Sequence, residues 1–202
     1  MYASVHQFRR SLPHETDGWA HALASALHEG QRPVASCALA QLAGLSGAVV
    51  TLWNHREEAD SAADRRVPGP VTWLDSGSYE VVATNDGVAA GRPPSYAQVT
   101  WFDGPRSPVQ VAADDRAGRE RIWPAVSAVA GSVGAWILRA DGLGMVVVAF
   151  ATSIGTFEQI QRAIMGTELL PGEDPALLAG PDRQDIHRVL FAELPVLAGK
   201  PS

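Results

Sequence analysis

The chain contains very few cysteines and lysines. Cys37 is its one cysteine in 202 residues, which excludes an intramolecular disulfide and a metal cluster held by several cysteines. Lys200 is its one lysine, so arginine supplies the rest of the 16 basic residues, a bias typical of a high-GC genome such as that of an actinobacterium. The net charge of −6 and the dispersed basic residues exclude a basic surface for nucleic acid.

Long apolar runs and familiar catalytic motifs are also missing. The longest apolar stretch, Met145 to Ala151, is too short to span a bilayer, and the first ten residues do not form a signal peptide. We therefore expect a cytoplasmic protein with no membrane partner. No G-x-G-x-x-G, P-loop, G-x-S-x-G or H-E-x-x-H motif is present. With 46% hydrophobic and 19% charged residues, the composition is that of a globular protein.

Two segments of the chain resemble each other. Residues 40–53 align without a gap with residues 137–150, and each segment has the pattern of a strand, a glycine-containing turn and a β-branched strand. The second strand ends in an aromatic residue in both copies, Trp53 and Phe150. Such an internal duplication constrains the fold more than any single residue does.

The hydrophobic periodicity predicts the same order of elements in each half. In the first half we expect strands at 3–9, 34–43, 48–53 and 79–84, with helices at 15–29 and 54–66. In the second half we expect strands at 97–102, 133–139, 145–151 and 185–193, with helices at 112–130 and 156–165. The glycine- and proline-rich stretch 87–95 predicts a linker, so we place one repeat at 1–90 and the other at 91–202. Residues 166–182 form an insertion with a turn of helix at 175–178.

The order β-α-β-β-α-β is typical of a ferredoxin-like unit, whose helices cover one face of an antiparallel sheet. The other face is apolar and requires a cover, which the second unit can supply. We therefore predict an α+β fold in which tandem ferredoxin-like repeats pack as a pseudo-symmetric α+β barrel. The duplication removes the need for a dimer and leaves a homodimer open.

The stretch from Val49 to Ala59, VVTLWNHREEA, is similar to the LWxSxEA strand-end pattern of the antibiotic-biosynthesis-monooxygenase members of the dimeric α+β barrel superfamily. The strand at 79–82 resembles the closing strand of that family, and the second half is more weakly similar, at 146–150 and 157–159. The resemblance covers nearly the whole chain. It implies an enzyme of secondary metabolism, a cofactor-independent monooxygenase that oxidises a planar aromatic or polyketide-like small molecule. Many superfamily members have no known activity, so the alternative is a non-catalytic ligand-binding barrel.

The resemblance also implies a site at the end of the strand that closes on Trp53. Trp53 would stack on the substrate, and Asn54, His55 and Arg56 would bind or deprotonate its oxygen substituent. The family's arginine has no counterpart that the sequence places. The alternative is a helix start, with Asn54 as N-cap and Glu57 as its capping-box partner. Because the gapless alignment puts residues 151–153 (Ala-Thr-Ser) opposite this polar cluster, we expect the site in the first half.

The remaining aromatic and histidine residues allow several interpretations. Tyr79, Trp101, Trp136 and His6 are candidates for binding an aromatic ligand, although the tryptophans equally suit a core. His6 and His187 lie on predicted strands. Either could bind haem, as in the chlorite-dismutase-like members of the superfamily, but the longer helical region of those proteins is missing, and a sheet hydrogen bond is the preferred interpretation.

Histidines 14, 21 and 28 recur every seven residues along the first predicted helix. Seven residues span about 10 Å of helix, too far for two ligands of one metal ion. We therefore expect these side chains to pack or face solvent, and we expect neither a metal nor a cofactor.

Overall fold

The computed structural model describes residues 1–10, 18–28, 30–69, 71–142 and 144–194. The chain divides into two compact units. Unit 1 comprises Met1–Val82 and the chain from Ile186 onward, and unit 2 comprises Ala83–Asp185. Each division falls inside a strand, β4 (Val71–Asp86) or β8 (Arg183–Glu193). The sequence predicted the boundary between the repeats after residue 90, whereas the first division lies after Val82. It did not predict that the chain from Ile186 onward, which includes most of the last strand, belongs to the first unit.

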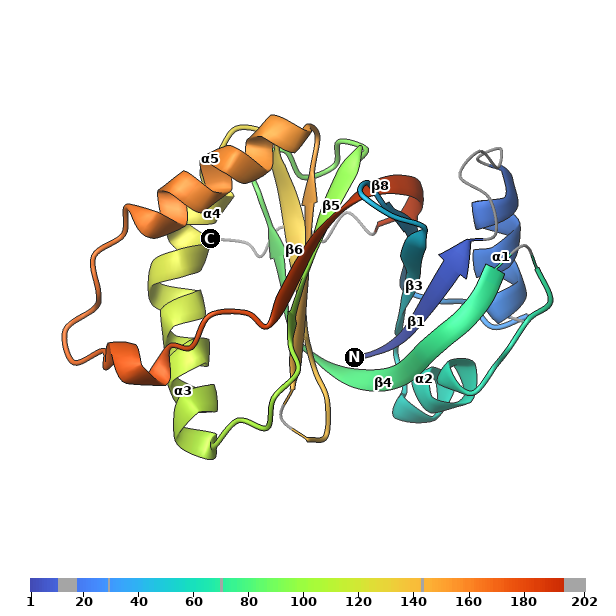
Figure 1. Ribbon diagram of the computed structural model, residues 1–202, viewed down its shortest axis with the longest axis horizontal. Coiled ribbons are helices and arrows are strands. Elements are labelled where there is room, and N and C mark those ends of the chain that lie inside the picture. The colour runs from blue at the N-terminus through green and yellow to red at the C-terminus, as the bar shows by residue number, and fades with distance from the viewer. Residues whose placement is uncertain (11–17, 29, 70, 143, 195–202) are drawn as a thin grey trace. The chain divides into compact units, whose positions relative to one another are not determined.

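Unit 1 is an antiparallel sheet with two helices on one face (Figure 1). Hydrogen bonds join β4 to β1, β1 to β3, β3 to β2 and β2 to β8. The order β4-β1-β3-β2 is that of a ferredoxin-like sheet. The new elements are β1 (Tyr2–Arg10), α1 (Gly18–His28), β2 (Ala35–Gln41), β3 (Ser46–Trp53) and α2 (Arg56–Ala63).

Helix α1 packs on the sheet through Ala20, Leu23, Ala24 and Leu27, which recur at helical spacing and are all buried. They contact Phe8 and other apolar residues of the strands below. Burying one leucine side chain contributes about 2 kcal/mol, so this stripe fixes the helix on the sheet.

Unit 2 has its own antiparallel strands, with β7 paired to β5 on one side and to β6 on the other. The predicted helix over 112–130 is three segments, because the ring of Pro124 and its missing N–H do not fit a regular α-helix. None of the helices among the described residues is long and apolar enough to cross a membrane. The elements are β5 (Tyr96–Phe102), α3 (Pro108–Ala117), the π-helix η1 (Gly118–Ile122), α4 (Trp123–Ser127), β6 (Ser132–Arg139), β7 (Met145–Ala151), α5 (Ile154–Met165) and the 3₁₀ turn η2 (Pro175–Leu177).

The hydrogen-bonded strand order is β1-β3-β2-β8-β5-β7-β6-β4, which is the order of a closed barrel. The expected α+β barrel class is therefore confirmed. The predicted fourth strand at 79–84 was too short, because β4 begins at Val71.

The strand registers correct the alignment of the two repeated segments. Tyr2 of β1 pairs with Trp53, and Tyr96 of β5 pairs with Ala151. Trp53 therefore corresponds to Ala151, one residue later than the gapless alignment gives. The second hairpin turn is shorter, since its last pair is Arg139–Met145 where the first hairpin has Ala40–Gly47. Residues 54–56 thus correspond to 152–154, so both helix starts carry polar residues and the expected contrast between them is weaker.

Gly47 is the residue over which the ring of Phe8 packs. A Cβ at Gly47 would lie 2.3 Å from the Leu39 carbonyl oxygen and 2.4 Å from Phe8 Cζ. Gly47→Ala should therefore lower the free energy of unfolding by about 1–3 kcal/mol, because the core cannot accept the methyl group without moving. Urea unfolding would measure this loss. The control is Gly155→Ala on α5, where a Cβ meets nothing within 4 Å; equal stability of the two variants would contradict the packing.

Candidate functional site

His6 lies on the helix-covered face of unit 1. Its side chain is 1% exposed, and its Nε2 atom is 2.9 Å from the carbonyl oxygen of Ala62 in α2. A carbonyl oxygen only accepts hydrogen bonds, so Nε2 donates and must carry the proton. In the neutral ring, Nδ1 then has a free lone pair. Among the described residues, no hydrogen-bond partner reaches Nδ1.

One aromatic ring contacts this imidazole, and two more rings continue from it. Trp73 of β4 meets the His6 ring in an edge arrangement, with 5.5 Å between ring centroids. Phe8 contacts Trp73 at 6.3 Å and Trp19 of α1 at 5.7 Å. We call His6, Phe8, Trp19 and Trp73 the His6 cluster. Both indoles are half-buried, whereas Phe8 is fully buried.

The surroundings keep His6 neutral. The pKa of His6 is lowered to about 4, mainly by burial; the hydrogen bond to Ala62 raises the pKa, and the positive charges of Arg66 and Arg65 lower it. At neutral pH the ring therefore presents an uncharged nitrogen with a free lone pair in an apolar setting. Such a group can accept a hydrogen bond or a proton.

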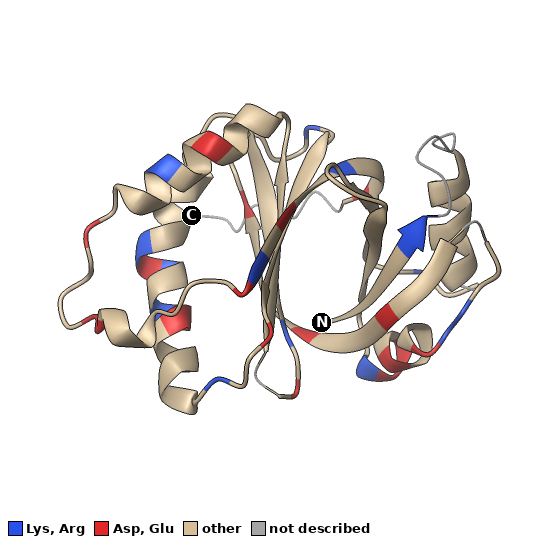
Figure 2. Cartoon of the chain, viewed as in Figure 1, with Lys and Arg blue, Asp and Glu red and all other residues tan. Residues whose placement is uncertain are grey.

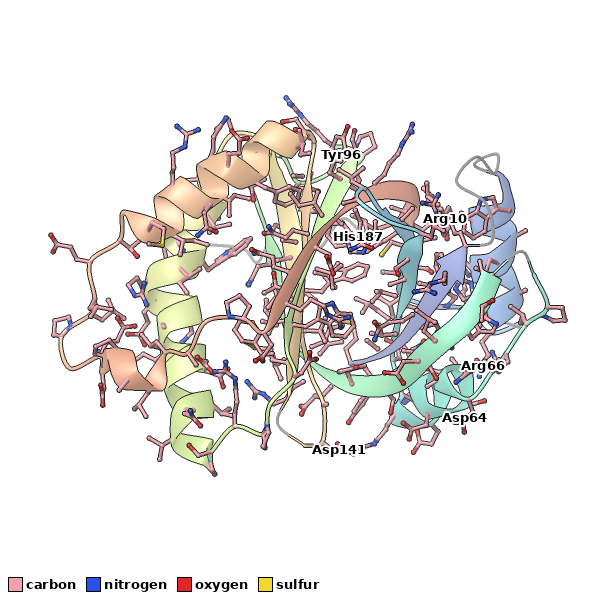
Figure 3. All side chains as sticks on the ribbon, in the orientation of Figure 1. Arg10, Asp64, Arg66, Tyr96, Asp141 and His187 are labelled. Carbon is pink, nitrogen blue, oxygen red and sulfur yellow. The ribbon has the colours of Figure 1, made fainter. Side chains whose placement is uncertain are left out.

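Arg66 and Ser76 form a polar rim beside His6. Ser76 pairs with His6 across β1 and β4, and its hydroxyl donates to the Ala63 carbonyl oxygen at 2.7 Å. Arg66 donates to the Ser76 hydroxyl at 2.7 Å and to the Ala63 carbonyl oxygen at 2.8 Å. Arg66 lies just beyond the end of α2, near Asp64 (Figure 3). Sequence reasoning did not place Trp73 and Ser76 in the site, because the predicted fourth strand began after them.

Trp53 also faces the helices. It is 1% exposed, packs against Ala59 and Ala62 of α2, and donates from Nε1 to the Ser4 hydroxyl at 3.0 Å. His28 meets its ring edge-on at 5.8 Å. The indole is thus a core side chain that a hydrogen bond anchors at its polar end.

Asn54, His55 and Arg56 lie exposed at the start of α2. His55 is the N-cap residue, and its backbone N–H donates to the Glu58 carboxylate at 3.1 Å. The helix therefore begins one residue later than in the alternative interpretation, a capping box of Asn54 and Glu57. Ala62, which holds His6, lies seven residues beyond His55, or about 10 Å along the helix axis. The structure thus does not bring these three residues together with His6.

The other predicted binding residues lie elsewhere. Tyr79 pairs with Ala3, so it occupies the face of the unit 1 sheet opposite that of His6. Trp101 and Trp136 belong to unit 2, where Trp136 meets Phe150 edge-on at 4.8 Å. Arg139 of β6 forms an ion pair with Asp115 of α3, so Trp136, three residues earlier, points away from the helices.

The histidines of α1 do not share a site. His21 packs edge-on against Phe191 at 4.8 Å, His28 contacts a serine, and His14 lies outside the described residues. His187 on β8 is 6% exposed, and Figure 3 labels it on that strand.

The described part of the chain holds no group of three His, Cys, Asp or Glu side chains that could bind a metal ion. Acidic and basic residues alternate along the helices of unit 2 instead of forming a patch of one sign (Figure 2).

Comparisons with known proteins show likeness in structure alone. No family model matches the chain, and no curated protein matches it. A candidate monooxygenase of Fusobacterium nucleatum superposes with a TM-score of 0.67 at 11% identity, over 96% of this chain and 94% of that one. An anthrone oxidase-like protein gives a TM-score of 0.60 at 14% identity, over 99% and 97% of the two chains.

A mutant chlorite dismutase of Candidatus Nitrospira defluvii is also similar, with a TM-score of 0.54 at 12% identity over 96% of this chain and 91% of that one. At such identities the three similarities establish a shared fold. The function has to be argued from the residues.

The buried, neutral His6 predicts a specific loss of stability in acid. In the unfolded chain its pKa returns to about 6.5, so between pH 6.5 and pH 4 the unfolded state binds a proton that the folded state does not. Stability is complete above pH 6.5, and about 3 kcal/mol of it should be lost as the pH falls to 4. His6→Gln should lack this part of the loss. Urea unfolding at successive pH values would show the difference, and parallel curves for the two proteins would contradict a neutral buried His6.

Proposed function

We propose that the protein is an antibiotic-biosynthesis-monooxygenase-like enzyme that oxidises a planar aromatic small molecule with O2 and without a bound cofactor. The observation that carries the proposal is the free lone pair of His6 Nδ1 inside the His6 cluster. The fold shared with a candidate monooxygenase and an anthrone oxidase-like protein supports the reaction class.

The chemistry needs a base and a place for negative charge. His6 Nδ1 would take a proton from an acidic C–H group of the substrate, and the resulting carbanion would reduce O2. For an anthrone, the CH2 group becomes C=O, one oxygen atom enters the substrate, and the other leaves as water with both hydrogens. The Arg65 and Arg66 charges that disfavour a charged His6 would stabilise the substrate anion.

The His6 cluster would also select the shape of the substrate. Rings that meet edge-on make room for a flat molecule only when one of them turns or moves. The indoles of Trp19 and Trp73 are half-buried and reach solvent, so they are the rings that would move. A planar aromatic substrate would replace contacts of one indole with its own stacking contacts. In this proposal Trp53 supports α2, and Asn54, His55 and Arg56 serve the helix start.

A non-catalytic ligand-binding protein is the second candidate. Its support is the aromatic character of the His6 cluster, because stacking on a planar ligand needs no proton transfer. In that case a planar aromatic ligand binds to the His6 cluster and is released unchanged.

Oxygen uptake with a hydroxyanthrone tests the proposal. The wild-type protein should consume one O2 per anthrone well above the buffer rate, and His6→Gln should lower this catalysed rate by about 100-fold or more. The double variant Asn54→Ala/His55→Ala should retain it. Binding of the anthrone without O2 consumption would support the ligand-binding alternative, and an absorption spectrum with a Soret band would favour haem instead.

A further inference from the structure

His28, the last residue of α1, lies in a hydroxyl network that our proposed reaction does not use. Its Nε2 atom is 3.2 Å from Ser36 Oγ on β2 and 3.5 Å from Thr51 Oγ1 on β3, and the two hydroxyls are 3.1 Å apart. A hydroxyl can donate or accept, so the network can satisfy His28 in either charge state. The serine and the threonine are fully buried, whereas the imidazole is half-buried.

Arg65 closes the same end of α1. Its Nη1 atom donates to the carbonyl oxygen of Leu27 at 2.6 Å and to that of His28 at 3.1 Å. We call this pair of hydrogen bonds the Arg65 clamp. Carbonyls at a helix end lack partners within the helix and favour a cation, so the clamp joins the end of α1 to the segment that follows α2.

The backbone of Arg65, whose side chain forms the clamp, shares one acceptor with His6. The backbone N–H of Arg65 donates to the Ala62 carbonyl oxygen at 3.0 Å, and His6 Nε2 donates to the same oxygen at 2.9 Å. A movement of Arg65 therefore changes the backbone turn that holds the His6 ring. This contact links the end of α1 to the orientation of the proposed base.

The charges around His28 come from three places in the described residues. Arg65 lies beyond α2, Glu193 is at the end of β8, and His21 is about two turns earlier on α1. Strands β2 and β3 contribute the two uncharged hydroxyls. Burial lowers the pKa of His28, Glu193 raises it, and Arg65 and His21 lower it. A charged His28 would stand beside Arg65 as a second cation at one helix end.

We propose that protonation of His28 weakens the Arg65 clamp and, through the shared Ala62 carbonyl, releases His6 from its fixed orientation. The inference rests on the proposed function for its effect on activity, while the structural coupling itself needs no substrate. The site is held in place at neutral pH and loosened in mild acid. Because burial lowers the pKa of His28, the change lies on the acid side of the ordinary titration of a histidine.

Nitrogen-15 NMR of the histidine rings, without substrate, tests this coupling. The His6 ring signals should show, besides the titration of His6 itself, a step that follows the titration of the His28 ring signals. His28→Gln, which keeps a hydrogen-bonding side chain, and Arg65→Gln should both remove the step. His55→Gln, at the exposed start of α2, should keep it.

Constant His6 signals across the His28 titration would overturn the proposal, and so would the same step in His28→Gln. Circular dichroism of each variant establishes that it is folded before the titration is interpreted. A protein that shows the coupling but consumes no O2 would refute the proposed function alone, whereas O2 uptake without the coupling would refute this inference alone.

Discussion

The hydrogen bond from His6 Nε2 to the Ala62 carbonyl oxygen is the contact on which the candidate site depends. It fixes the proton on one nitrogen and leaves the lone pair on the other. It also joins β1 to α2, since a ring nitrogen of the strand and a backbone oxygen of the helix satisfy each other in a place closed to water. Without it, the imidazole would have two unsatisfied nitrogens among apolar rings.

At His6, the property that would serve the reaction lowers the stability of the fold. Burial makes His6 neutral, which leaves Nδ1 able to accept a proton, but an unpartnered polar atom in a core costs free energy. An ordinary core would place a hydrophobic residue here, as it does at Phe8 and Val5 on the same strand. The buried imidazole is the reason that we propose a functional role for this position, since perturbed titratable groups are frequent in active sites.

The sequence was sufficient to predict the class of fold, because strand and helix periodicities and the duplicated hairpin are local patterns. It failed at β4, where Asp75, Ser76 and Gly77 have the composition of a turn. Pairing with β1 overrides that local preference, and the pairing could not be read from the chain. His6 was found as an aromatic-site candidate, but its partners Ala62, Trp73 and Arg66 are distant in sequence. Residues 54–56 were predicted as the site because they are polar and adjacent in the sequence. Adjacent polar residues are equally typical of a helix start.

The central claim is that His6 presents a free Nδ1 lone pair to an aromatic ligand in unit 1. The most direct measurement is the nitrogen-15 spectrum of His6 at pH 7, recorded with and without a hydroxyanthraquinone under anaerobic conditions. We expect a proton on Nε2, an unprotonated Nδ1 in the free protein, and a shift of the Nδ1 signal when the ligand is added. A proton on Nδ1, or an Nδ1 signal that the ligand leaves unchanged, would contradict the account.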